Sequence, residues 1–137
     1  MQFVDTNIFI RYLINDDPDK AGACRQLFEL AKLNQVSLTT SESIIAEIVY
    51  VLSSKRLYNL ARQDVRIRLY PLLSLPGLKL AHRSRYLRAL NLYSNNNVDF
   101  EDALTLAAME SEQITELYSY DEDFDSVKEC AVVRVEP

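Results

Sequence analysis

Short apolar runs alternate with longer amphipathic segments along the whole chain. Short apolar runs predict strands, and segments in which apolar residues recur every three or four positions predict helices. We therefore expect short strands at residues 3–4, 36–39, 78–80, 116–120 and 131–135. We expect a first helix from residue 8 to the Asp16-Asp17-Pro18 break, and further helices at residues 19–33, 43–54, 62–73, 83–93 and 100–111.

This alternation predicts an α/β fold, in which a parallel sheet is covered by helices on both faces. The chain has 137 residues, which suits one domain with a sizeable core. We see no internal repeat, low-complexity segment or linker in it. We therefore expect a single domain over residues 1–137.

Composition excludes several classes of protein. Apolar residues make up 48% of the chain, which argues against disorder. No apolar run is long enough to span a bilayer, and the first residues lack the pattern of a secretory signal. Cys24 and Cys130 are far apart and form no CxxC pair, so we interpret them as buried thiols in a reducing compartment. We therefore expect a cytoplasmic protein that does not contact a membrane.

The charges are unevenly distributed. The formal net charge is −5, which does not by itself favour nucleic-acid binding. The segment from Lys55 to Arg88, however, contains nine basic residues and a single acid, Asp64. The segment from Asp99 to Glu129 contains eleven acids and one lysine. A positive surface beside a negative pocket would produce this pattern, although two solvated helix faces would as well.

The scarce residue types limit the chemistry. Two glycines leave no GxGxxG or phosphate-binding loop, and one histidine, His82, leaves no zinc cluster. No GxSxG nucleophile motif is present. If the protein is an enzyme, its catalytic groups are therefore carboxylates and the metal ions that they hold.

The first candidate acid lies where the first strand ends. Phe3 and Val4 read as a short buried strand that leads into Asp5, Thr6 and Asn7. In an open α/β sheet, ligands bind at the carboxyl ends of the strands, so Asp5 is a candidate ligand. A helix cap at Asp5 or Thr6 is the alternative interpretation.

The second candidate acid lies in a very apolar helix. Glu47 is the only charged residue from Ser43 to Leu52. On a helical wheel it lies beside an inner stripe made of Ile45, Ile48, Val49 and Leu52. A carboxylate there must reach water, a partner or a cation, because burying it unpaired is costly. Glu42, by contrast, fits the last position of a capping box, Thr39-Thr40-Ser41-Glu42.

The remaining candidates lie in the acidic third of the chain. Asp99 is well placed as a helix N-cap, and Asp102 falls in the first turn of the nearly charge-free helix that follows. Asp121 follows a strand, as Asp5 does. The alternation of Asp121, Asp123 and Asp125 is not a calcium-binding EF-hand loop, because the glycine and glutamate of such a loop are missing.

In a parallel α/β fold, strand carboxyl ends and helix amino ends share one edge. We therefore expect Asp5, Glu47, Asp102 and Asp121 to converge there. Clustered carboxylates repel one another unless a cation neutralises them. All-oxygen sites of this kind suit Mg²⁺ or Mn²⁺, and such a site suits phosphoryl chemistry.

With these features the chain resembles a PIN-domain ribonuclease, and most closely a VapC-type toxin of a bacterial toxin–antitoxin pair. The resemblance is carried, in this order, by Val4-Asp5-Thr6-Asn7-Ile8-Phe9-Ile10-Arg11-Tyr12-Leu13, Ser43-Ile44-Ile45-Ala46-Glu47-Ile48-Val49-Tyr50-Val51-Leu52, Asp99-Phe100-Glu101-Asp102-Ala103-Leu104 and Ser119-Tyr120-Asp121-Glu122-Asp123-Phe124. It implies a three-layer α/β/α sandwich with a short, four- to five-stranded parallel sheet.

The resemblance also implies residue roles. The quartet of catalytic and metal-binding acids would be Asp5, Glu47, Asp102 and Asp121, around Mg²⁺ with Mn²⁺ as a substitute. The auxiliary positions would be Asn7, Asp99, Ser119 and Asp123. Ser119 stands where the family usually has threonine and keeps the hydroxyl group.

The function implied is a metal-dependent endoribonuclease that leaves a 5′-phosphate and a 3′-hydroxyl. Family members of this type commonly form homodimers and are silenced by a small antitoxin protein. The basic segment from Lys55 to Arg88 is the candidate surface for the RNA backbone. A nuclease of RNA maturation, a phosphatase with an aspartyl nucleophile and a non-enzymatic binding module remain alternatives. Asn7 stands where such a phosphatase usually carries a second aspartate, which counts against that alternative.

Overall fold

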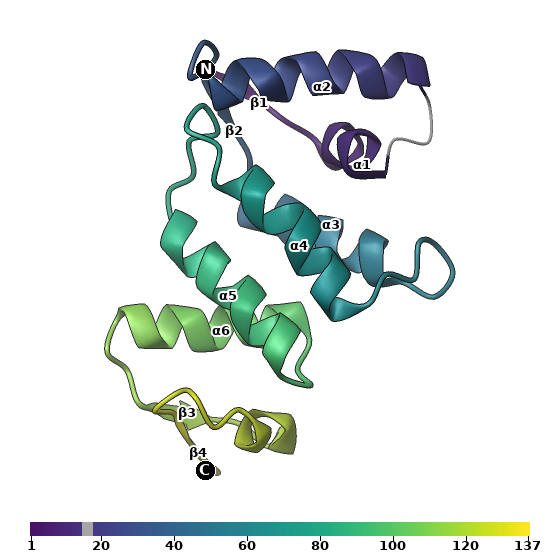
Figure 1. Cartoon of the computed structure of the whole chain (residues 1–137). Coiled ribbons are helices and arrows are strands. Elements are labelled where there is room, and N and C mark those ends of the chain that lie inside the picture. Colours follow the sequence, from purple (N-terminus) through teal and green to yellow (C-terminus); the bar gives the residue numbers. More distant parts are fainter. Residues whose placement is uncertain (15–17) are drawn as a thin grey trace. The chain divides into compact units, whose positions relative to one another are not determined.

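Six α-helices and four short strands make up most of the computed structural model, which describes residues 1–14 and 18–137 (Figure 1). The helices are α1 (Thr6–Ile14), α2 (Pro18–Lys32), α3 (Glu42–Ser53), α4 (Arg62–Leu73), α5 (Arg83–Asn95) and α6 (Phe100–Ser111). The strands are β1 (Gln2–Phe3), β2 (Leu38–Thr39), β3 (Glu116–Tyr118) and β4 (Val133–Val135), and η1 (Glu122–Ser126) is a 3₁₀ helix. The chain divides into two compact units, Met1–Arg83 and Ser84–Pro137, which we describe separately.

The helical periodicity predicted the helices well. Helices α4 and α6 have the predicted bounds, and the other described helices differ from prediction by a few residues at their ends. The predicted helix break includes Asp16 and Asp17, which lie outside the described residues. The residues after Asp121, for which no helix was predicted, form the 3₁₀ helix η1. The predicted strand at residues 78–80 is wrong, because Leu78 makes an isolated bridge to Leu38 and no strand is described there.

Each unit holds one small parallel sheet. In the first unit β1 pairs with β2, with Gln2 opposite Leu38. In the second unit β3 pairs with β4, with Glu116 opposite Val133. The predicted parallel pairing is confirmed within both pairs, and the mostly helical chain is consistent with an α/β/α fold. The single sheet of four to five strands and the single domain over residues 1–137 stay predictions.

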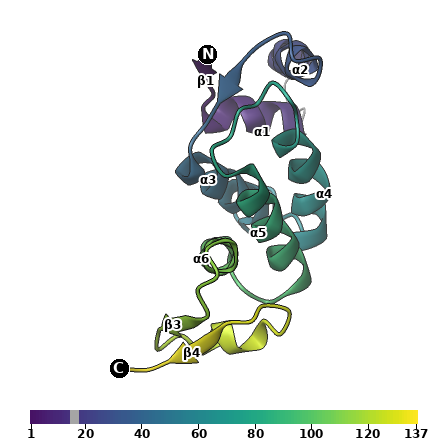
Figure 2. The same ribbon diagram turned by 90° about the vertical axis from the view of Figure 1, so that its left-hand side faces the viewer.

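The core of the first unit surrounds α1. This helix packs against both α2 and α3 (Figure 2), and the rings of Phe9 and Phe28 stack with centroids 5.4 Å apart. On α3 the predicted stripe is the buried one: Ile45, Ile48, Val49 and Leu52. Phe3 was predicted to be buried but is 62% exposed, whereas the adjacent Val4 is 4% exposed. Successive residues of a strand point to opposite faces, so only one of these two enters the core.

Gly77 lets two backbone segments approach closely in the first unit. Its N–H donates to the carbonyl oxygen of Ala31 at 2.7 Å, and its own carbonyl accepts the N–H of Leu38 at 2.7 Å. A Cβ atom at residue 77 would lie 2.6 Å from backbone atoms of Ala31 and Val36. Glycine is therefore required where the chain passes between the end of α2 and β2.

In the second unit α5 and α6 each bury an apolar face, and Tyr93 packs edge-on against Phe100 with ring centroids 6.1 Å apart. Both cysteines are buried free thiols, as predicted. None of the helices within residues 1–14 and 18–137 combines the length and the apolar character needed to cross a membrane.

Candidate functional site

The turn that follows β1 is held at both backbone groups of Val4. The Val4 N–H donates to the carbonyl oxygen of Thr39 at 2.9 Å, and the hydroxyl of Thr40 donates to the carbonyl oxygen of Val4 at 2.8 Å. The carbonyl oxygen of the next residue, Asp5, accepts the N–H of Ile8 at 3.2 Å and opens α1. Asp5 is exposed. It therefore lies at the carboxyl end of a strand, as predicted, on a backbone fixed from both sides.

Thr6 links this turn to Glu47. Its hydroxyl donates to Oε2 of Glu47 at 2.7 Å across 41 residues of sequence. Thr6 is 5% exposed, whereas Glu47 is exposed and lies beside the buried stripe of α3. One hydrogen bond thus joins the predicted acid Glu47 to the residue that follows Asp5.

The start of α3 differs from the predicted capping box. Ser41 is the N-cap, and its hydroxyl oxygen accepts the N–H of Ile44 at 3.2 Å. The hydroxyl of Thr39 instead donates to the carbonyl oxygen of Lys79 at 2.7 Å. The predicted cap was wrong by two residues because β2 extends to Thr39 and uses it in the sheet.

A small pocket opens beside the first turn of α1. Its lining residues are Asn7, Ile10 and Arg11 of α1 and Tyr58 of the turn between α3 and α4, and its volume is about 100 Å³. The predicted auxiliary residue Asn7 is exposed on α1.

In the second unit the predicted N-cap at Asp99 is confirmed. Its Oδ1 accepts the N–H of Asp102 at 2.8 Å, which places Asp102 in the first turn of α6. Carboxylates near a helix N-terminus gain from the helix dipole.

Asp102 nevertheless ionises less readily than an isolated aspartic acid. Burial, followed by the charges of Asp99, Asp121, Asp123 and Glu101, raises the pKa of Asp102 from 3.8 to about 6. These acids come from the start of α6 and from the segment after β3, so the second unit gathers the C-terminal acids that the sequence predicted. Such a cluster favours a proton or a cation as a neutralising partner.

The segment after β3 is ordered by hydrogen bonds. The Ser119 hydroxyl oxygen accepts the N–H of Asp121 at 3.0 Å, and Oδ1 of Asp121 accepts the N–H of Asp123 at 2.9 Å. Arg134 of β4 donates to the carbonyl oxygen of Ser119 at 3.0 Å and pairs with Asp125 at 3.0 Å. This ion pair lowers the pKa of Asp125. The acidic turn is thus a fixed structure and not a loose loop.

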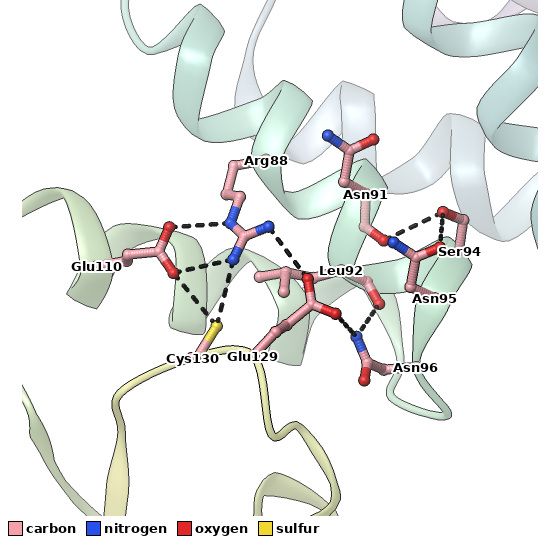
Figure 3. A network of polar contacts seen from close by, with 9 residues as sticks. All are labelled: Arg88, Asn91, Leu92, Ser94, Asn95, Asn96, Glu110, Glu129 and Cys130. Atoms are coloured by element: carbon pink, nitrogen blue, oxygen red, sulfur yellow. Dashed lines mark hydrogen bonds and ion pairs between the residues drawn. The ribbon is translucent and has the colours of Figure 1, made fainter.

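Arg88 holds a second network in the same unit (Figure 3). Its guanidinium donates to both carboxylate oxygens of Glu110, at 2.9 and 3.1 Å, and to Glu129 at 3.1 Å. The Cys130 thiol donates to Glu110 at 3.4 Å, and burial, with the Glu110 carboxylate, raises the pKa of that thiol to about 11. Asn96 also donates to Glu129, at 3.3 Å. The network ties the segment before β4 to α5 and α6.

The basic segment is therefore only partly a surface for a ligand. Arg68 donates to the carbonyl oxygen of Leu13 at 2.8 Å, and Arg83 donates to three carbonyls between Leu73 and Leu78. Lys79, Arg85 and Arg88 also bond to protein side chains, so at least five of the nine basic residues serve the fold itself. Lys55 and Arg56, in the turn after α3, are exposed.

The donor set fits a hard divalent cation, because the candidate ligands are all carboxylates. Within residues 1–14 and 18–137, no three His, Cys, Asp or Glu side chains are close enough together to hold a metal ion. The first unit joins Thr6 to Glu47 near Asp5, and the second unit gathers Asp99, Asp102, Asp121 and Asp123. The convergence of all four quartet acids stays a prediction.

Sequence reasoning missed the partner of Thr6 and the positioning role of Arg134. Thr6 was noted as part of the turn after Asp5, but Glu47 lies 41 residues away in the sequence. Arg134 was visible only as one of two basic residues, with Lys128, in the acidic C-terminal third of the chain.

Comparison with known proteins gives one family. The model of the PIN domain matches residues 3–129, which run through both units. No curated protein sequence matches the chain significantly.

Proposed function

The chain belongs to the PIN domain family, and from this premise we propose that it is a metal-dependent endoribonuclease. Proteins of this family are generally nucleases that act on RNA and use divalent metal ions. The observation that carries the proposal for this chain is the match of the PIN-domain model to residues 3–129. The carboxylates of Asp99, Asp121 and Asp123 support it, because their charges help to raise the pKa of Asp102 and would be relieved by a cation.

The residues that would hold the cation, Mg²⁺ with Mn²⁺ as a substitute, are the four predicted acids, Asp5, Glu47, Asp102 and Asp121. A cation held by these residues would polarise a phosphate oxygen and lower the pKa of a bound water. Asp102 would hold the cation in its carboxylate form, because metal binding requires a deprotonated ligand. Asp99 and Asp123 add negative charge around it.

Thr6 and Ser119 would position two of these acids, Glu47 and Asp121. The Thr6 hydroxyl occupies Oε2 of Glu47, which leaves Oε1 for the cation or the attacking water. The Ser119 hydroxyl fixes the N–H of Asp121. Asn7 stays near Asp5 on α1 as an auxiliary polar group.

RNA cleavage by the purified protein tests the proposal. We expect cleavage of single-stranded RNA in Mg²⁺, loss in EDTA, and products with a 5′-phosphate and a 3′-hydroxyl. Asp102→Asn should lower the rate by at least about 100-fold, since a metal ligand matters more than its supporting groups. Glu116→Gln removes an exposed acid of β3 outside this cluster and should change the rate less than about twofold, as expected for a surface substitution.

Cleavage that persists in EDTA, or in Asp102→Asn at the wild-type rate, would refute the metal-dependent mechanism. A wild-type protein that neither cleaves RNA nor gains thermal stability from Mg²⁺ or Mn²⁺ would favour the binding-module alternative.

We further propose that the protein acts as the toxin of a type II toxin–antitoxin pair, as a cytoplasmic homodimer silenced by a cognate antitoxin. The support is the resemblance of its motifs to VapC-type toxins. Induced expression in bacteria should stop growth, and Asp102→Asn or co-expression of the neighbouring small gene should restore it. A harmless, active wild-type nuclease would favour RNA maturation instead.

A further inference from the structure

The pocket beside Asp5 is not explained by the metal site. It is lined by Asn7, Ile10, Arg11 and Tyr58 and has a volume of about 100 Å³. Asn7 follows Asp5 by two residues, and Arg11 lies one helical turn after Asn7. The pocket therefore adjoins the backbone turn that carries the first predicted catalytic acid.

The size and lining of the pocket indicate a ligand class. Its volume corresponds to about three water molecules, which admits a phosphate group but no whole nucleotide. An amide, a guanidinium and a phenol supply most of the lining. Arginine binds phosphate oxygens through two parallel hydrogen bonds, and asparagine adds a neutral donor.

The wall opposite α1 adds a second kind of contact. Tyr58 is half-buried in the turn between α3 and α4, and the same turn carries the exposed residues Lys55 and Arg56. Aromatic rings beside basic side chains are typical of sites for single-stranded nucleic acids, because an unpaired base stacks on the ring while cations hold the backbone.

We propose that this pocket binds a phosphate of single-stranded RNA next to the cleaved bond, with Arg11 and Asn7 on the phosphate and the ring of Tyr58 against the adjoining base. The proposal rests on the proposed nuclease function and deepens it, because it assigns residues of this chain to one phosphate and one base of the substrate strand. The subsite lies entirely in the first unit.

The salt dependence of RNA binding tests the phosphate contact. A labelled single-stranded RNA is titrated in EDTA at several KCl concentrations, and fluorescence anisotropy gives the association constant. Arg11→Gln should weaken binding and reduce the slope of log K against log salt by about 0.7, the value for one phosphate contact to a single strand. Arg25→Gln, an exposed arginine of α2, is the matched control and should leave the slope unchanged.

Substitutions of Tyr58 test the stacking contact. Tyr58→Ala should weaken binding by about tenfold with an unchanged salt slope, because it removes a ring and no charge. Tyr58→Phe keeps the ring and should bind within about twofold of wild type, and Tyr58→Leu replaces the alanine variant if that one does not fold. Duplex RNA of the same sequence should show no dependence on Tyr58, since its bases are not free to stack.

Cleavage in Mg²⁺ separates this proposal from the nuclease proposal. Arg11→Gln should raise KM and leave kcat nearly unchanged, as expected for binding that is equal in the ground and transition states. If wild type cleaves RNA and Arg11→Gln keeps the wild-type slope and KM, the subsite is refuted and the nuclease function stands. Equal effects of Tyr58→Ala on duplex and single strand refute the stacking contact, and a wild-type protein that binds no RNA refutes the subsite as well.

Discussion

Asp102→Asn should stabilise the metal-free protein while it inactivates the proposed site. The substitution removes one negative charge from the cluster of acids at the start of α6 and keeps the size of the side chain. The backbone cap is untouched, because Asp99 bonds the N–H of residue 102 and not its side chain. The variant thus tests the electrostatic interpretation of the cluster directly.

The magnitude follows from the raised pKa. A rise from 3.8 to about 6 makes the charged form of Asp102 about 3 kcal/mol less favourable in the folded state, at 1.36 kcal/mol for each pKa unit. Asp102 is only half-buried, so solvent screening reduces this penalty, and the variant also loses the interaction of a carboxylate with the helix dipole. We expect a net gain of about 1 kcal/mol, which raises Tm by about 3 °C for a chain of this length.

The stability gained by Asp102→Asn should depend on pH. Because the pKa of Asp102 is higher in the folded state, the penalty is absent below about pH 3.8, grows as the pH rises to about 6 and is constant above it. The advantage of Asp102→Asn should therefore be full at pH 7.5 and fall to about a fifth at pH 4.

Urea unfolding in EDTA at both pH values measures this effect. Asp125→Asn is the opposite control, because Arg134 lowers the pKa of Asp125 and its loss should not stabilise the protein at pH 7.5. Adding Mg²⁺ should stabilise wild type and not Asp102→Asn. A variant that is less stable than wild type at pH 7.5 in EDTA, or equally improved at both pH values, would refute the reasoning.

Three further predictions concern positioning and packing. Thr6→Val should slow RNA cleavage and lower the free energy of unfolding by about 1 kcal/mol through loss of the hydrogen bond to the α3 glutamate, whereas Thr6→Ser should restore both; equal rates for the two variants would contradict this role. Arg134→Gln should speed amide hydrogen exchange within residues 119–126, measured by mass spectrometry, and unchanged exchange would show that the ion pairs do not hold this turn. Gly77→Ala should lower the free energy of unfolding by about 1–3 kcal/mol through backbone overlap, whereas Gly22→Ala in α2, whose Cβ meets no atom within 4 Å, should raise it by about 0.5–1 kcal/mol; urea titration checks both signs.

The helices could be predicted from the sequence because each carries its own periodic signal. The buried stripe of α3 and the cap at Asp99 are local properties, and both were predicted correctly. Strands of two or three residues carry too little pattern to fix their limits, which is why residues 78–80 were misassigned. The cap of α3 was misplaced because three consecutive hydroxyl residues, Thr39, Thr40 and Ser41, all suit a cap by sequence. Only tertiary structure assigns the first to the carbonyl of Lys79 and the second to that of Val4.

Some features of the candidate site are likewise local and predictable, and others depend on contacts between distant residues. The positions of Asp5 and Asp121 after strands and of Asp102 in a first helical turn follow from local sequence. The contact between Thr6 and Glu47 joins residues 41 positions apart, and no periodic pattern reports such a contact. The network of Arg88 was likewise hidden, because sequence shows a charge and not its partner.

Several arginines of the basic segment bond to the protein itself, which reduces the positive charge available for binding RNA. A count of nine basic residues in the middle segment suggests a broad positive surface, yet Arg68, Arg83 and Arg88 hold carbonyl and carboxylate groups of the protein. Cations that are already paired this way offer little attraction to an RNA phosphate. Binding to a chain of net charge −5 must then depend on a few locally placed cations. The turn after α3 provides two exposed ones, Lys55 and Arg56, in the same turn as Tyr58 of the pocket, so charge removal there should weaken RNA binding more than the same removal on α4 or α5.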